Sequence, residues 1–320
     1  MLLSKLTAEI IRRNTKKYDD MRIAKQTPPA GVSVEVYDYL PDGDSMHKLN
    51  VYRPEEVSGK LPVIVNIHGG AWVYGDKDLN KYYCMYLASK GFLVMGMSYR
   101  LMTAVTLKEQ VQDVFASMCF LADNAERLGA DAENVMLSGD SAGGHLASLA
   151  ACIMRSPELA AVYGVKVPAL SVKCLVMSHP VGQVHSVMLD KHLRPSRAGG
   201  AVQRIFDGIL FGKERKKHEV YAHAAFTEYS AELTLPPTLL IGCERDVYVR
   251  HSQLLSRLFE DMVGEGRCPR FVFDYVPAAE ETRKLRHVYN IVHYEWRESM
   301  RVNDLSLEFF RESMKKDGAE

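Results

Sequence analysis

The sequence predicts an α/β fold: a mostly parallel central sheet with helices on both faces and a cap insertion. From residue 62 onwards, short apolar runs that are too short for helices alternate with longer amphipathic stretches. This alternation is typical of βαβ units. Of the 320 residues, 47% are apolar, which is enough for one large core. We therefore expect a single domain that spans residues 1–320.

The expected strands begin near the N-terminus. Residues 32–39 and 48–52 have strand patterns and flank turn residues at 41–44, so they predict a pair of neighbouring strands. Six apolar runs predict the buried strands that follow: 62–67, 92–97, 135–137, 172–177, 238–241 and 271–275. Between them we expect one helix that ends at Gly91 and a long amphipathic helix over 107–127.

Two segments fall outside this alternation. Residues 183–232 lie between two expected strands but contain no strand-like run, and residues 5–19 form a basic amphipathic pattern. The first segment carries an apolar group that needs cover in water: Ile205, Phe206, Ile209, Leu210 and Phe211. We expect residues 183–232 and 1–30 to be cap elements above the carboxyl ends of the strands. The N-terminal helix could also touch a membrane surface, but packing on its own domain is the commoner use of such a helix.

The charge balance and the cysteines exclude several classes of protein. With 40 Lys+Arg against 40 Asp+Glu, the chain has no cationic excess for general nucleic-acid binding. No apolar run reaches the roughly 18 residues of a membrane helix, so we expect no stable membrane insertion. The six cysteines form no short C-x-x-C pair, and we expect no metal. The N-terminus lacks an apolar run of signal-peptide length, which favours a cytoplasmic location.

The strongest local signal is a G-x-S-x-G motif formed by Gly139, Ser141 and Gly143. It follows the expected strand 135–137 directly and precedes a helical stretch, which is the arrangement of a nucleophile elbow. A side chain at either glycine would collide with the neighbouring strand and helix. The N-terminus of the following helix favours developing negative charge. We therefore predict that Ser141 is a nucleophile.

A second motif lies upstream of the first. Gly69 and Gly70 follow the expected strand 62–67, and two consecutive glycines allow backbone N–H groups to turn into a pocket. Together with the N–H of Ala142, their amides predict an oxyanion hole with three donors.

These motifs resemble those of the hormone-sensitive-lipase-like carboxylesterases, a branch of the α/β-hydrolases that includes arylacetamide deacetylase-like and arylformamidase-like enzymes. The matching pieces are His68-Gly69-Gly70-Ala71-Trp72, Tyr99-Arg100-Leu101, Asp113 and Gly139-Asp140-Ser141-Ala142-Gly143-Gly144. Ala71 replaces the third glycine of the family's usual motif, and Met102-Thr103 replaces its Ala-Pro-Glu. The resemblance implies the α/β-hydrolase fold and hydrolysis of esters or amides without a cofactor.

In this fold the catalytic residues follow the order serine, acid, histidine. Asp246 lies a few residues after the expected strand 238–241, in the place that the family uses for the acid, and Glu244 is the alternative. His287, followed two residues later by an aromatic side chain, resembles the family's base, and His293 is the alternative.

The sequence thus predicts a serine carboxylesterase for small acyl esters. Ser141 would attack the acyl carbonyl, His287 would accept the proton, and Asp246 would fix the imidazole tautomer. An arylformamidase-like amidase is the alternative, because that branch shares the helix with Gln110 and Asp113. A non-catalytic ligand receptor is a third class, which typically lacks the triad histidine. The expected partner is a small ester or amide substrate, and a homodimer is left open.

Overall fold

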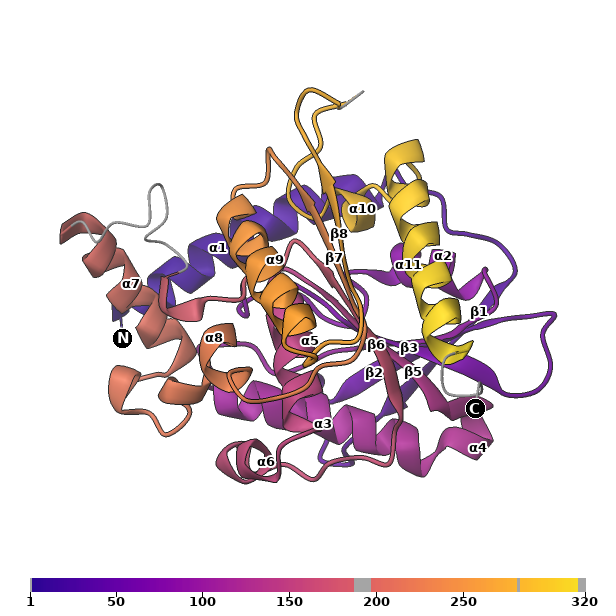
Figure 1. Ribbon diagram of the computed structural model, residues 1–320, viewed down its shortest axis with the longest axis horizontal. Coiled ribbons are helices and arrows are strands. Elements are labelled where there is room, and N and C mark those ends of the chain that lie inside the picture. The colour runs from indigo at the N-terminus through magenta and orange to yellow at the C-terminus, as the bar shows by residue number, and fades with distance from the viewer. Residues whose placement is uncertain (1, 187–196, 281–282, 316–320) are drawn as a thin grey trace.

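The computed structural model describes residues 2–186, 197–280 and 283–315, and an eight-stranded sheet forms its centre (Figure 1). The strands are β1 (Val32–Asp38), β2 (Lys48–Pro54), β3 (Leu61–Ile67), β4 (Leu93–Met97), β5 (Ala130–Asp140), β6 (Val172–Ser178), β7 (Thr238–Cys243) and β8 (Phe271–Val276). Their order is β1-β2-β4-β3-β5-β6-β7-β8. β2 pairs antiparallel with both β1 and β4, and all other neighbours are parallel. The mostly parallel sheet predicted from the sequence is confirmed.

The helices connect these strands. They are α1 (Leu2–Ile23), α2 (Lys81–Ala88), α3 (Leu107–Asp123), α4 (Ala125–Leu128), α5 (Ala142–Ile153), α6 (Pro157–Tyr163), α7 (Arg197–Leu210), α8 (Phe226–Tyr229), α9 (Val249–Gly264), α10 (Tyr289–Val292) and α11 (Arg297–Lys315). The described residues also form three 3₁₀ turns: η1 (Val184–Ser186), η2 (Arg215–Lys217) and η3 (Tyr221–His223). The single helix expected over 107–127 is interrupted at Asn124, whose side chain donates to the Phe120 carbonyl at 2.8 Å. A local side-chain bond of this kind competes with continuation of the helix.

The sheet separates two apolar cores. Figure 1 shows α2 and α11 on one side of it and α3, α5 and α9 on the other. Successive side chains of β7 alternate between the two cores: Leu239 and Ile241 face α11, whereas Leu240 belongs to the opposite core. A strand that is buried on both faces reads as a continuous apolar run, which is why the sequence reveals these strands without polar alternation.

Two helices distant in sequence, α1 and α7, lie side by side (Figure 1). The Ser4 hydroxyl donates to the Ile205 carbonyl at 3.1 Å, and a Cβ on Gly208 would lie only 2.4 Å from that hydroxyl oxygen. Residues 187–196 of the expected cap lie outside the described residues. Within the described parts of the chain, no helix has the length and apolar character needed to cross a bilayer.

Candidate active site

The nucleophile elbow has the expected geometry. Ser141 joins β5 to α5 with a φ of 52° and a ψ of −117°, a conformation that non-glycine residues rarely adopt. Its tight turn leaves no space at either flanking glycine. A Cβ on Gly139 would lie 2.3 Å from the Gly143 carbonyl oxygen, and one on Gly143 would lie 2.0 Å from that of Ile67. Backbone sterics therefore explain why this turn needs glycine at both positions.

The expected acid and base are brought together. Nδ1 of His287 lies 2.8 Å from Oδ1 of Asp246, and the same oxygen accepts the Tyr248 amide at 3.0 Å. Burial raises the pKa of Asp246, but the hydrogen bond and charge of His287, together with the smaller effects of His179 and the Tyr248 amide, hold this pKa below its usual value. A neutral His287 that donates its Nδ1 proton to the carboxylate keeps Nε2 as an acceptor. That tautomer is the one a general base for a serine requires.

Two aromatic rings hold the His287 imidazole from the sides. Tyr248 lies edge-on at 5.1 Å and His179 at 5.9 Å between ring centroids. His179 follows β6, has a left-handed φ of 49° and is fully buried. Its Nδ1 bonds the Ser178 hydroxyl at 2.9 Å, and that hydroxyl donates to Asn290 at 2.6 Å. Burial lowers the pKa of His179 to about 3, so its ring stays neutral.

The sequence pattern predicts no role for His179. The available signal was its position at the carboxyl end of a strand, on the sheet edge that also carries Ser141. Ligands bind along this edge in open α/β sheets.

One expected oxyanion donor is already occupied. The Gly69 amide donates to Oδ1 of Asp140 at 3.1 Å, and the Asn80 amide group donates to the same oxygen at 2.8 Å. Asp140 is deeply buried, which raises its pKa to about 6 even though these bonds and the nearby His287 lower it. Because its N–H has an acceptor inside the protein, Gly69 anchors the loop, and this counts against its expected role as an oxyanion donor.

The next two amides are in a different position. Gly70 and Ala71 have positive φ values of 105° and 53°, border the same cavity as Ser141, and donate to no acceptor among the described residues. Ala142 is the first residue of α5, and amides in the first turn of a helix have no acceptor within it. Within the described chain, the amides beside Ser141 without an acceptor are therefore those of Gly70, Ala71 and Ala142. The oxyanion role expected for Gly69, Gly70 and Ala142 stays a prediction.

The two alternatives for acid and base have other partners. Glu244 accepts the Ala278 amide at 2.7 Å. His293 stacks on Trp296 with 3.9 Å between ring centroids, and its Nε2 lies 3.4 Å from the Tyr18 hydroxyl. Neither of them contacts the Asp246–His287 pair through a hydrogen bond within the described chain.

Gln110 and Asp113, which the amidase alternative shares, both brace the scaffold. Gln110 donates to the carbonyls of Trp72 and Arg100 at 2.8 and 2.7 Å. Asp113 accepts from the Arg100 guanidinium, with the shortest contact at 2.7 Å. These bonds stabilise the loops on either side of the Gly70 turn, so the two residues do not distinguish an amidase from an esterase.

Ser141 and His287 border one cavity of about 640 Å³. This volume lies in the usual range for a small-molecule site. The loops after the strands supply its floor, and its walls include residues of α1 and α7: Thr7, Ile11, Thr15, Ile205 and Phe206. Among the described residues no group of three or more His, Cys, Asp or Glu side chains is arranged to hold a metal ion.

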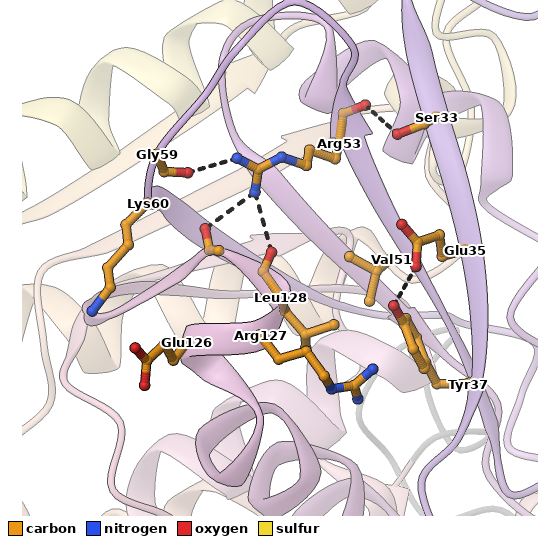
Figure 2. Close-up of a pocket in the computed structure, with 11 residues that line it drawn as sticks. Ser33, Glu35, Tyr37, Val51, Arg53, Gly59, Lys60, Glu126, Arg127 and Leu128 are labelled. Carbon is orange, nitrogen blue, oxygen red and sulfur yellow. Dashed lines mark hydrogen bonds between the residues drawn. The ribbon is translucent and has the colours of Figure 1, made fainter.

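A second cavity, of about 480 Å³, lies beside the edge strand β1, its neighbour β2 and α4 (Figure 2). Figure 2 shows Arg53 with its guanidinium bonded to backbone carbonyls, which include Leu128 at 3.1 Å and Gly59 at 2.6 Å. Arg53 thus ties the start of β3 to the end of α4. The described lining of this cavity holds no serine–histidine pair, and we assign it no chemistry.

The chain is similar to several esterases. The BD-FAE family model matches residues 49–261. Esterase B from Lactobacillus Rhamnosis (HN001) is 33% identical with a TM-score of 0.89, and the match covers 98% of this chain and 96% of that chain. A further esterase B structure, with a C4-C4 SN3 tributyrin phosphonate inhibitor, has the same identity and coverage and a TM-score of 0.88.

A curated relative matches a shorter region. Isoprenylcysteine alpha-carbonyl methylesterase ICME from Arabidopsis thaliana is 32% identical over 113 residues, which are 35% of this chain and 26% of that protein. The chain thus spans only about a quarter of the length of the curated relatives that it matches first.

The names of these relatives agree with the carboxylic ester hydrolase class expected from the sequence. The α/β-hydrolase fold is confirmed by the strand order and by the match to esterase B. Since the family model covers more than half of the 320 residues, the chain belongs to the BD-FAE family, within the hormone-sensitive-lipase-like carboxylesterases.

Proposed function

We propose that this protein hydrolyses carboxylic esters with small acyl groups, and that Ser141 is its nucleophile. One observation carries the proposal: a serine in a strained elbow and a buried Asp246–His287 pair border the same cavity. This combination supplies the nucleophile, base and orienting acid of acyl transfer. It also argues against a non-catalytic ligand receptor, which would not need that pair.

The proposed reaction has two halves. Ser141 Oγ attacks the ester carbonyl while Nε2 of His287 takes its proton, and Asp246 stabilises the resulting imidazolium. The amides of Gly70, Ala71 and Ala142 donate to the oxyanion. His287 then returns the proton to the departing alkoxide, which leaves an acyl-enzyme. Water attacks that ester by the same route, and Ser141 is regenerated.

We further propose that residues 1–30 and 183–232 cap this site within a single domain. The support is that α1 and α7 contribute Ile11, Ile205 and Phe206 to the cavity wall, whereas the strand loops contribute the reacting groups. A largely apolar wall suits acyl chains. The cavity volume suits short acyl chains. The similar esterase B is solved with an inhibitor named as a C4-C4 tributyrin phosphonate, which also has short chains.

Fluorophosphonate labelling of the full chain tests the nucleophile. The probe should label wild-type protein at Ser141, and Ser141→Ala should abolish labelling. Ser33→Ala, in β1 at the far edge of the sheet, is the matched control and should label fully. Hydrolysis of p-nitrophenyl acetate should exceed that of an N-formyl aryl amide, and the reverse preference would favour the amidase. Undiminished labelling of Ser141→Ala would refute the assignment.

A further inference from the structure

The N-terminal helix packs with its polar side inwards. In α1 the small residues Ser4 and Ala8 are buried, with 1% and 0% of their surface exposed. Leu3, Leu6 and Ile10 are instead 56%, 54% and 53% exposed. The close contact with α7 requires small side chains on the inner side, so Leu3, Leu6 and Ile10 face outwards, whereas Ile11 lines the cavity. An amphipathic helix that packs only on its own domain would have the opposite orientation.

The exposed residues form one continuous line along α1. We call it the outer stripe, and it consists of Leu3, Leu6, Ile10, Arg13, Lys17 and Met21, all of which are exposed. Their spacing of three or four residues places them on a single face of the helix. The stripe is apolar over its first half and carries two cations in its second half. Contiguous exposed apolar side chains with cations beside them are typical of helices that lie in a lipid interface.

The charges of α1 add a second observation. The helix has six basic and three acidic residues, and each acid already pairs within the helix. Glu9 pairs with Arg12, Asp20 with Lys16 and Asp19 with Arg22. The remaining cations are Lys5, Arg13 and Lys17, which have no ion-pair partner among the described residues. The helix therefore carries an uncompensated positive charge on its exposed side, although the whole chain is neutral.

We infer that the outer stripe of α1 binds the surface of an anionic lipid bilayer. The leucines and isoleucine would enter the headgroup boundary, and Lys5, Arg13 and Lys17 would contact lipid phosphates and carboxylates. A second copy of the chain fits this surface less well. The α1 helix of another copy would offer Arg13 and Lys17 no free acid, because all acids of α1 are already engaged.

The position of α1 links this surface to the cavity. The inner side of the same helix lines the cavity through Thr7, Ile11 and Thr15, so a bilayer bound to the outer stripe would lie next to the cavity wall. Apolar esters concentrate in lipid interfaces. That the bound bilayer supplies substrates to the cavity rests on the proposed ester hydrolysis. That the outer stripe binds lipid does not depend on it.

Vesicle sedimentation with the full chain tests the inference. Vesicles of phosphatidylcholine alone are compared with vesicles of equal parts phosphatidylcholine and phosphatidylserine. Wild-type protein should sediment with the anionic vesicles and lose binding as salt is raised. Arg13→Gln/Lys17→Gln should weaken this binding about 25-fold, since each cation near an anionic surface changes affinity about five-fold. Leu6→Gln/Ile10→Gln should weaken it at least as much.

The control replaces another exposed apolar pair, Val34→Thr/Val36→Thr in β1, and should bind like the wild type. Thermal unfolding of each variant checks that the fold is intact, and fluorophosphonate labelling reports on the catalytic site separately. No binding to anionic vesicles, or equal binding by wild type and Leu6→Gln/Ile10→Gln, would overturn the inference. It would also be overturned by a solution dimer that Leu6→Gln/Ile10→Gln dissociates.

Discussion

The floor and the roof of the cavity are built by different means. The floor consists of the loops that follow strands of the sheet and carries Gly70, Ser141, Asp246 and His287. Glycine sterics, buried hydrogen bonds and parallel strand ends fix each of these positions. The roof consists of α1 and α7, which are joined across 201 residues of sequence by contacts such as that of Ser4 with Ile205.

This difference separates chemistry from selection. A change in the floor should alter the rate for every ester alike, because it affects the reacting atoms. A change in the roof should alter which acyl chains are accepted, because the roof contributes only wall. The two are joined by hydrogen bonds from α1: Arg12 donates to the carbonyls of Val73 and Met102, behind the Gly70 turn, and Arg22 donates to those of Leu79 and Val292.

The largest effect is expected from the acid–base pair. His287→Ala should lower kcat by about 10⁴ for every ester, and Asp246→Asn somewhat less, because serine and histidine act as one unit. His293→Ala and Glu244→Gln are the matched controls and should retain activity. Steady-state kinetics with p-nitrophenyl acetate measures kcat for each of these variants. If His293→Ala or Glu244→Gln lost activity while His287→Ala stayed active, the assignment of the base or the acid would be wrong.

The next largest effect on kcat is expected from Asp140, which anchors the loop that carries Gly70 and Ala71. Asp140→Ala removes the shared acceptor of the Gly69 and Asn80 donors, so the amides of Gly70 and Ala71 lose their fixed direction. We expect kcat to fall by about 10² to 10³, the usual loss for one oxyanion donor, with little change in KM. Asp140→Asn keeps an acceptor oxygen and should recover most of that loss. Equal activity of Asp140→Ala and wild type would show that the loop needs no such anchor.

We also expect a residue of the floor, His179, to make the stability of the protein depend on pH. His179 is neutral when folded because burial lowers its pKa to about 3, but in the unfolded chain it protonates near pH 6.5. The unfolded state thus binds more protons, and stability falls as pH drops below 6.5. This group alone should cost about 2 kcal/mol between pH 6.5 and 4.5. Urea unfolding of His179→Phe should show a correspondingly smaller loss, and identical pH profiles would contradict this view.

The floor was largely predictable because short-range rules determine it. Apolar runs marked the six strands from β3 to β8, and Gly139, Ser141 and Gly143 specify their turn through local sterics. The bond of the Gly69 amide to Asp140 was not predictable, because Asp140 lies 71 residues away and the sequence does not show which of two neighbouring amides has a partner. The break at Asn124 was missed because the pattern of apolar residues continues across it.

The roof was less predictable because tertiary contact overrides helix patterning there. The sequence indicates an amphipathic helix near residues 5–19 but not which face turns inwards. The close approach of Ser4 to Gly208 decides that, and it exposes Leu6 and Ile10. Phe206 and Phe211 look equivalent in sequence, yet Phe206 lines the cavity, whereas Phe211 packs on Tyr221 at 5.0 Å.

That pair offers the most direct test of the division between floor and roof. The measurement is the ratio of kcat/KM for p-nitrophenyl octanoate to that for p-nitrophenyl acetate, in Phe206→Ser and Phe211→Ser. We expect Phe206→Ser to change this ratio about ten-fold while acetate hydrolysis stays near the wild-type rate. Phe211→Ser should keep the wild-type ratio and lose about 3 kcal/mol or more of stability. If Phe206→Ser kept the wild-type ratio and lost only stability, α7 would be scaffold and the division would be wrong.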